Sequence, residues 1–143
     1  MRAALVQLTV TDDPEENLAV TLGHVRAAAA AGAEFVLTPE CTNALSSSRE
    51  HQRRILRPEE EDATLAALRE EAARAGIWLL VGSLGLRTHE ADGRFANRSF
   101  LIGPDGAVAA RYDKIHMFDV NVSETEVYRE SAAYRPGGAA VLA

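Results

Sequence analysis

The 143-residue chain contains a single cysteine, Cys41, which limits the chemistry open to it. No internal disulfide can form, and this fits a reducing compartment. The chain also lacks a basic excess, because 15 lysines and arginines stand against 21 aspartates and glutamates and the formal net charge is −6. Nucleic-acid binders carry clustered positive charge, whereas the arginines here are scattered, so we do not expect nucleic acid as a partner.

Long hydrophobic runs are missing as well. No segment approaches the roughly 18 apolar residues that a membrane span requires. The N-terminus, MRAALVQLTVTDDPEE, lacks the longer apolar core and the small-residue cleavage site of a signal peptide. We therefore predict a soluble cytoplasmic protein without a membrane partner, folded as one domain over residues 1–143.

The apolar segments predict an α/β fold. Short runs typical of strands occupy residues 2–10, 33–40, 77–83, 95–102 and 107–112. A helix is expected to begin after Asp13, with Pro14 in its first position, and to end near Gly32. A second helical pattern runs from Glu60 to Gly76. Residues 41–58 are expected to form a loop with a short helix.

The later part of the chain has an antiparallel pattern. In the segment GPDG (103–106), Pro104 suits the second position of a type I turn and Gly106 the left-handed position that follows, which predicts a hairpin. The chain closes on an apolar run at 139–143, interpreted as a strand that is cut short or as a short terminal strand of the sheet.

Glu40 directly follows a predicted strand, in the segment LTPE. Pro39 fixes its own φ and biases Thr38 toward extended backbone, so the carboxylate is held at the C-terminal end of a strand, where α/β sheets usually bind ligands. Partial burial there would raise the pKa of Glu40 and allow it to act as a general base near neutral pH. The alternative is a strand-end glutamate that caps the backbone or meets solvent.

Lys114 closes the last predicted hairpin strand, in the segment RYDKIHMFDV (111–120), which we expect to run from a strand into a loop. A lysine held in a crevice can donate hydrogen bonds to a developing oxyanion and supply a fixed positive charge. The alternative is a surface lysine that pairs with Asp113 or Asp119.

Cys41 neighbours Glu40 and could be read as a nucleophile, since a thiolate needs a nearby base. Adjacent residues of an extended chain point to opposite faces, however, and a lone cysteine is most often a small buried hydrophobe. We therefore expect a structural Cys41. The four histidines lack metal-ligand spacing, so no metal site is expected. The segment PGG (136–138) is expected to be a turn.

Taken together, several segments resemble the nitrilase superfamily of carbon-nitrogen hydrolases. These are RAALVQLTV, AEFVLTPE, IWLLVGS, ANRSFLIGPDG and RYDKIHMFDV, followed by YRES and YRPG. They cover nearly the whole chain in the family's order, and the resemblance is closest to the amidase branch, with its omega-amidase-like and deaminated-glutathione-amidase-like members. It implies an α-β-β-α sandwich, of which this chain resembles the N-terminal half: a mixed sheet with helices on one face.

The resemblance assigns roles to three residues. Glu40 matches the family's general base, Lys114 the lysine that stabilises the tetrahedral intermediate, and Glu130 the second glutamate that many members place near substrate and lysine. The family's nucleophilic cysteine has no match among the 143 residues, so we expect a truncated chain. The implied reaction converts a small-molecule amide into a carboxylic acid and ammonia through a thiol acyl-enzyme. No metal or organic cofactor is implied, and a homo-oligomer is compatible with the resemblance.

A second interpretation is a catalytically inactive fragment or a binding module. Half of a sandwich would leave one apolar sheet face bare, and that face could pair with another chain. An independent chemistry that uses Cys41 is a third alternative. These interpretations differ in what they predict for ammonia release, self-association and the pKa of the thiol.

Overall fold

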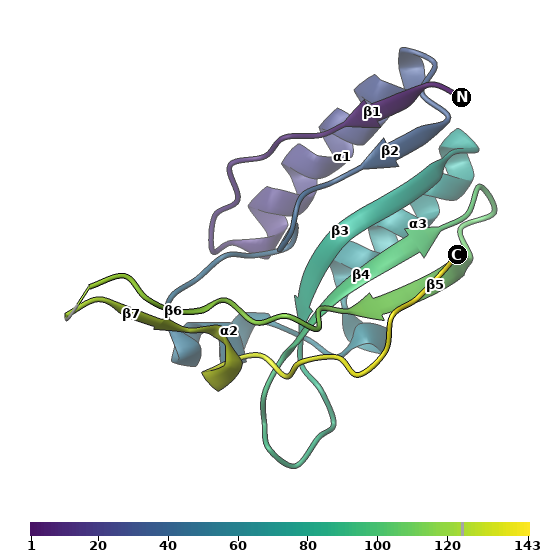
Figure 1. Cartoon of the computed structure of the whole chain (residues 1–143). Coiled ribbons are helices and arrows are strands. Elements are labelled where there is room, and N and C mark those ends of the chain that lie inside the picture. The colour runs from purple at the N-terminus through teal and green to yellow at the C-terminus, as the bar shows by residue number, and fades with distance from the viewer. Residues whose placement is uncertain (124) are drawn as a thin grey trace.

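The computed structural model describes residues 1–123 and 125–143 and has the expected α/β fold (Figure 1). Five strands form the main sheet in the order β1-β2-β3-β4-β5. They are β1 (Ala3–Leu5), β2 (Phe35–Leu37), β3 (Trp78–Leu86), β4 (Ala96–Ile102) and β5 (Val108–Asp113). The helices are α1 (Pro14–Ala30), α2 (Arg49–Ile55) and α3 (Ala63–Ala75), with 3-10 turns at Glu59–Glu61 and Glu130–Ala132. Within the described residues, no helix is both long and apolar enough to cross a membrane.

The main sheet is mixed. Strands β1, β2 and β3 are parallel, because α1 and α3 lie in the connections between them. Strands β3, β4 and β5 are antiparallel and directly connected. The predicted turn between β4 and β5 is present: Gly106 has a φ of 77°, and its N–H donates to the Gly103 carbonyl at 2.9 Å. The sheet therefore changes from a parallel half to an antiparallel half at β3.

Helix ends follow the capping pattern in the sequence. The Asp13 side chain accepts hydrogen bonds from the N–H groups of Glu15 and Glu16 at the start of α1. Helix α3 ends at Gly76, which has a φ of 65°. The predicted start of this helix at Glu60 was wrong, because the Asp62 side chain caps α3 and leaves Glu59–Glu61 as a separate 3-10 turn.

The two faces of the sheet have different surroundings. One register row, Ala4–Val36–Leu79–Ile102–Val108, belongs to the core that packs against α1 and α3. The next row, Leu5–Leu37–Leu80–Leu101–Ala110, lies on the opposite face. None of the side chains in this second row is fully buried.

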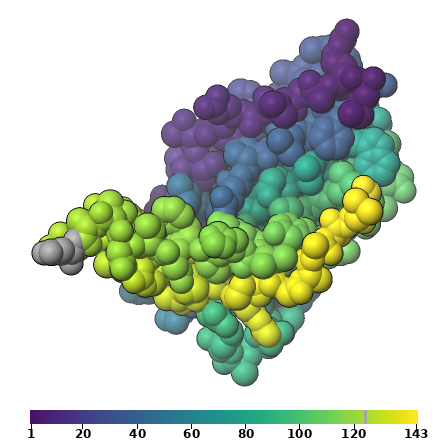
Figure 2. Space-filling view, in the orientation of Figure 1, coloured from purple at the N-terminus to yellow at the C-terminus, as the bar shows by residue number. Residues whose placement is uncertain are grey.

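We call the second face the open face. Figure 2 views the molecule from this side, with both long helices behind the sheet. Leu5 is 78% exposed, and Trp78, two positions before Leu80 and therefore on the same face, is 40% exposed. A sheet with helices on one face and apolar residues on the other corresponds to one half of an α-β-β-α sandwich.

The expected run from a strand into a loop over residues 111–120 is confirmed, because β5 ends at Asp113 and residues 114–118 have no helix or strand. Beyond this loop, β6 (Asp119–Asn121) and β7 (Val127–Arg129) form a short antiparallel hairpin, which was not predicted and which projects from the main sheet (Figure 1). The apolar run at 139–143 is not a strand, because no neighbouring backbone pairs with it among the described residues. The first strand is also shorter than residues 2–10: it pairs with β2 over Ala3–Leu5, and the Val6 N–H donates to the carbonyl of Leu37, the last residue of β2, at 2.8 Å.

Candidate active site

The three predicted site residues lie together at one end of the sheet. The Lys114 ammonium donates to Glu40 Oε1 at 2.9 Å and to Glu130 Oε1 and Oε2 at 3.0 and 2.9 Å. Glu40 follows β2, Lys114 follows β5 and Glu130 begins the 3-10 turn after β7. Residues distant in sequence thus form one ion-pair cluster.

The alternative of a surface lysine that pairs with a neighbouring aspartate was wrong. Asp113 binds the Arg98 guanidinium through both carboxylate oxygens, at 2.6 and 2.9 Å. Asp119 accepts hydrogen bonds from the Ser131 N–H at 3.0 Å and from its hydroxyl at 2.6 Å. Both aspartates are occupied elsewhere, and Lys114 faces the two glutamates.

The loop that carries Glu40 is fixed to β3. The Thr38 and Thr42 hydroxyls share a hydrogen bond of 2.8 Å, and the Thr42 N–H donates to the Ser83 carbonyl at 2.8 Å. Strand β3 is irregular between Val81 and Leu84. A Cβ at Gly82 would lie 2.2 Å from the Thr38 carbonyl oxygen, so only glycine allows this approach.

Asn43 completes the attachment of this loop. Its amide donates to the Gly85 carbonyl at 2.8 Å, and its Oδ1 accepts from the Gly85 N–H at 2.9 Å. Asn43 therefore bonds to β3 as a neighbouring strand would. The Asn17 amide of α1 in turn donates to the Asn43 carbonyl at 2.9 Å. These contacts explain the burial of Asn17.

The backbone of Lys114 is held from both sides. Its N–H donates to the Asn97 carbonyl at 2.9 Å, and its carbonyl accepts from the Gly137 N–H at 2.9 Å. A Cβ at Gly137 would lie 2.2 Å from the Asp113 carbonyl oxygen. The PGG segment, expected to be only a turn, thus approaches the end of β5 closely enough to require glycine.

The two carboxylates differ in how fully they are bonded. Glu130 is only 14% exposed, and its Oε2 accepts from the Phe118 N–H at 2.6 Å in addition to Lys114. Glu40 is 55% exposed and accepts both of its hydrogen bonds at Oε1. Glu40 Oε2 has no hydrogen-bond donor among residues 1–123 and 125–143. Glu40 thus keeps one unbonded oxygen, whereas both oxygens of Glu130 are bonded.

Asn97, at the start of β4, is a site residue that the sequence reasoning missed. Its Nδ2 donates to Glu40 Oε1 at 2.7 Å and lies 3.5 Å from Glu130 Oε1. The side chain is buried, with 2% of the residue exposed. The sequence offered one signal for Asn97: a polar residue near the start of a largely apolar strand, in the segment ANRSFLI.

The expected rise in the pKa of Glu40 was wrong. Burial does raise the pKa, but the hydrogen bonds from Lys114 and Asn97 outweigh it, and the net result is a pKa below the usual 4.5. For Lys114, burial alone would lower the pKa, and the bonds to Glu130 and Glu40 raise it above 10.5. Both groups are therefore charged at neutral pH, as an ion pair requires.

Comparison with known proteins places the chain in a family. The family model described as carbon-nitrogen hydrolase matches residues 2–143. The chain belongs to this family. Deaminated glutathione amidase of Yersinia enterocolitica is 36% identical over 136 residues, which are 94% of this chain and 46% of that protein. Human omega-amidase NIT2 is 33% identical over 139 residues, 95% of this chain and 48% of the human protein.

Solved structures agree with the fold of this carbon-nitrogen hydrolase chain. An amidase from Nesterenkonia sp. is 28% identical, with a TM-score of 0.75 over 97% of this chain and 49% of the amidase. The C. elegans NitFhit protein has a TM-score of 0.83 over 95% of this chain and 33% of its own, and at 24% identity it supports the fold alone. The chain spans about half the length of the curated relatives it matches.

Cys41 of this carbon-nitrogen hydrolase chain has the properties of an unreactive thiol. Burial, followed by the charges of Glu40 and Glu130, raises its pKa to about 11. Its N–H donates to Ser83 Oγ at 2.8 Å, and its φ of 54° puts it in the left-handed region. The extended geometry assumed from the sequence is therefore absent, but a thiol that stays protonated is a poor nucleophile.

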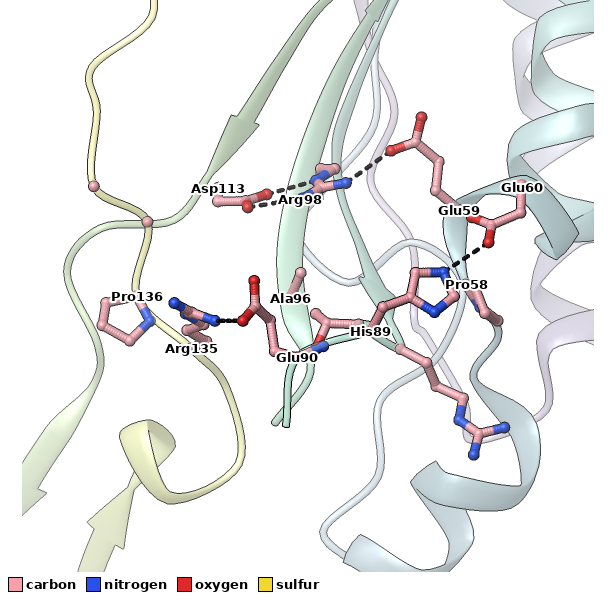
Figure 3. Close-up of a pocket in the computed structure, with 14 residues that line it drawn as sticks. Pro58, Glu59, Glu60, His89, Glu90, Ala96, Arg98, Asp113, Arg135 and Pro136 are labelled. Carbon is pink, nitrogen blue, oxygen red and sulfur yellow. Dashed lines mark hydrogen bonds and ion pairs between the residues drawn. The ribbon is translucent and has the colours of Figure 1, made fainter. Parts of the chain in front are cut away.

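A separate polar cavity of about 480 Å³ lies beside β4 (Figure 3). Arg98 crosses it between Asp113 and Glu59, and His89–Glu60 and Arg135–Glu90 pairs lie along its wall. Arg98 directly follows Asn97, and Asp113 directly precedes Lys114. The Arg98–Asp113 ion pair therefore links β4 and β5 next to these two site residues. Among the described residues, no group of histidine, cysteine and acidic side chains has the arrangement of a metal site.

Proposed function

We propose that this chain contributes the general base and the oxyanion-stabilising cation to an enzyme that hydrolyses small amides to a carboxylic acid and ammonia. The observation that carries the proposal is the unequal bonding of the two carboxylates around Lys114. Glu40 retains an unbonded Oε2 that can take a proton, whereas Glu130 directs both oxygens to Lys114 and the backbone. The family membership supports the reaction class.

In this proposal Glu40 transfers the protons of a thiol mechanism. Its carboxylate takes the proton of a cysteine thiol, and the thiolate attacks the amide carbon. The tetrahedral oxyanion is stabilised by the Lys114 ammonium, which stays protonated because its pKa is raised. The C–N bond then breaks, the nitrogen takes the proton from Glu40 and ammonia leaves. Water attacks the thioester with Glu40 as base, which releases the acid and restores the thiol.

Glu130 has a positioning role in this mechanism. It fixes the Lys114 ammonium through both carboxylate oxygens, and the Phe118 N–H fixes Glu130. Both oxygens of Glu130 already accept hydrogen bonds, from Lys114, Asn97 and the Phe118 N–H. We therefore assign the proton transfers to Glu40 alone. The mechanism uses no metal or organic cofactor.

The proposal places the nucleophile outside these 143 residues. Cys41, with a thiol pKa of about 11, is unsuited to the role. One form of the Nesterenkonia amidase carries acrylamide added at its active-site cysteine. We propose that residues 1–143 form part of a single carbon-nitrogen hydrolase domain whose nucleophile lies on a further segment, and that the protein acts in the cytoplasm.

A second candidate function is a binding module, which the open face favours. Leu5 and Trp78 expose apolar surface on a sheet face that lacks a second layer in the described structure. In this proposal the face pairs with another chain, and a homo-oligomer is one outcome. Size-exclusion chromatography with light scattering tests it: concentration-dependent self-association supports the module, and a folded monomer contradicts it.

The amidase proposal is tested by extending the chain. The locus beyond codon 143 is sequenced, the protein is expressed with any residues that follow, and ammonia release is measured on a panel of omega-amides. We expect the extended protein to release ammonia and the 143-residue chain to remain at background. Ammonia release by the 143-residue chain at a comparable rate would contradict the assignment of the nucleophile to another segment.

A further inference from the structure

Asn97 occupies a position opposite Lys114 in the candidate site. Both residues approach the same two acceptors, Glu40 Oε1 and Glu130 Oε1. The four groups alternate donor, acceptor, donor, acceptor and close into a ring. One donor of this ring is charged and the other is neutral.

We propose that Asn97 is a positioning residue that fixes the rotation of the Glu40 carboxylate and leaves Oε2 as the proton-accepting atom. This inference rests on the proposed function for the role of Glu40. It concerns a residue outside the Glu40, Lys114 and Glu130 set that the sequence resemblance supplied.

The orientation of the Asn97 amide follows from the chemistry of its partners. Ionised carboxylates only accept hydrogen bonds, so only the NH₂ end of the amide can face them. The 2.7 Å bond to Glu40 Oε1 is short, as expected for a bond to a charged acceptor, and the side chain is buried. A buried amide with this bond holds the carboxylate oxygen in a defined place.

A neutral donor has a specific advantage at this point. During the reaction Lys114 must direct hydrogen bonding toward the substrate oxyanion, which weakens its bond to Glu40. Asn97 still donates to Glu40 Oε1 and keeps that oxygen bonded. Because Asn97 adds no positive charge, it does not compete with Lys114 for the developing negative charge on the substrate.

The backbone of Asn97 links the same two residues. Its carbonyl accepts from the Lys114 N–H at 2.9 Å while its side chain bonds Glu40. The neighbouring side chains Ala96 and Arg98 line the cavity of Figure 3, and the Asn97 amide is directed to the carboxylates instead. Through Asn97, strand β4 therefore sets the position of the base relative to the lysine.

The test follows the titration of individual glutamate carboxyl groups by ¹³C NMR in the 143-residue chain. Asn97→Ala removes the donor, and Asn97→Ser keeps one shorter hydroxyl donor. The matched control is Gln52→Ser, which alters another buried amide side chain that bonds the Ser46 carbonyl and the Tyr134 hydroxyl but not Glu40. Amide spectra report whether each variant is folded.

We expect the titration midpoint of Glu40 to rise in Asn97→Ala, to rise less in Asn97→Ser and to stay at the wild-type value in Gln52→Ser. An unchanged Glu40 midpoint in a folded Asn97→Ala chain would overturn the inference. If Asn97→Ala does not fold, Asn97→Ser decides by the same criterion. Loss of folding in both variants would also overturn it, since Asn97 would then be required for the fold itself.

This experiment separates the inference from the proposed function because it does not measure catalysis. A shifted Glu40 midpoint in a protein whose extended form has no amidase activity would refute only the proposed function. Amidase activity together with an unshifted midpoint would refute only the role of Asn97. In an active extended protein, we further expect Asn97→Ala to lower kcat by about 10- to 100-fold with little change in KM.

Discussion

Lys114 donates a hydrogen bond to Glu40 Oε1 at 2.9 Å, although 74 positions separate the two residues in sequence. Replacing Lys114 with methionine leaves two carboxylates close together without a cation. We expect Lys114→Met to lower the free energy of unfolding at pH 7 by about 1–3 kcal/mol, measured by urea denaturation. The double variant Lys114→Met/Glu40→Gln should recover part of this loss, because it removes one of the two like charges. No recovery would contradict repulsion as the cause.

The pH dependence of this contribution follows from the directions of the two pKa shifts. Glu40 has a lowered pKa, so its stabilisation is present above the usual value of 4.5 and is lost as the pH falls through the folded-state pKa. Lys114 has a raised pKa, so its stabilisation is present below 10.5 and is lost as the pH rises through the folded-state pKa. The difference in unfolding free energy between wild type and Lys114→Met should therefore be largest near neutral pH. It should shrink as the pH falls toward 4.5, because the repelling carboxylates of the variant take up a proton, and it should shrink again as the pH rises above 10.5. A difference that grows at acidic pH would contradict the ion pair.

Because Glu130 and Glu40 are bonded unequally, their substitution should lower the free energy of unfolding by different amounts. Glu130→Gln places an amide NH₂ against donors from Lys114 and the Phe118 backbone, at a site with 14% exposure. We expect a loss of about 2–3 kcal/mol, against less than about 1 kcal/mol for Glu40→Gln at its more exposed position. Thermal denaturation of both variants at pH 7 measures this order. A larger loss of stability in Glu40→Gln than in Glu130→Gln would contradict the finding that Glu130 is the more fully bonded carboxylate.

The raised pKa of Cys41 predicts a slow thiol. With a pKa of about 11, only about 0.1% of the thiol is ionised at pH 8, and the thiolate is the reactive form. The rate of alkylation by iodoacetamide should rise about tenfold per pH unit from pH 7 to 10 without reaching a plateau. The unfolded chain in urea is the control and should level off nearer pH 9. If the alkylation rate of the folded chain reached a plateau near pH 8, the high pKa would be contradicted and an independent chemistry at Cys41 would be supported.

Much of the architecture was predictable, because the elements that form it carry local signals. Asp13, Pro14 and Gly76 mark helix ends, and the turn at 103–106 needs the positive φ of Gly106. The placement of Glu40 at the end of β2 followed from an apolar run and a proline. These features depend on residues near in sequence, so the sequence alone predicts them.

Features that depend on distant partners were missed. Asn97 shows its role only when β4 is placed beside the Glu40 loop and Glu130. The lowered pKa of Glu40 depends on donors from β4 and from beyond β5, so burial alone gave the wrong sign. The hairpin of β6 and β7 has strands of three residues each, too short for a periodic pattern to reveal. The apolar run at 139–143 has a strand-like composition, but it pairs with no strand in the part of the chain that the structure describes.

The role of Glu40 as the general base is tested most directly by Glu40→Gln in the extended protein, assayed for ammonia release from an omega-amide. The substitution keeps the shape of the side chain and the hydrogen bond from Lys114 but removes the proton acceptor. We expect kcat/KM to fall by about 100-fold or more while the circular dichroism spectrum stays unchanged. Activity of a folded Glu40→Gln protein within about threefold of wild type would contradict this role.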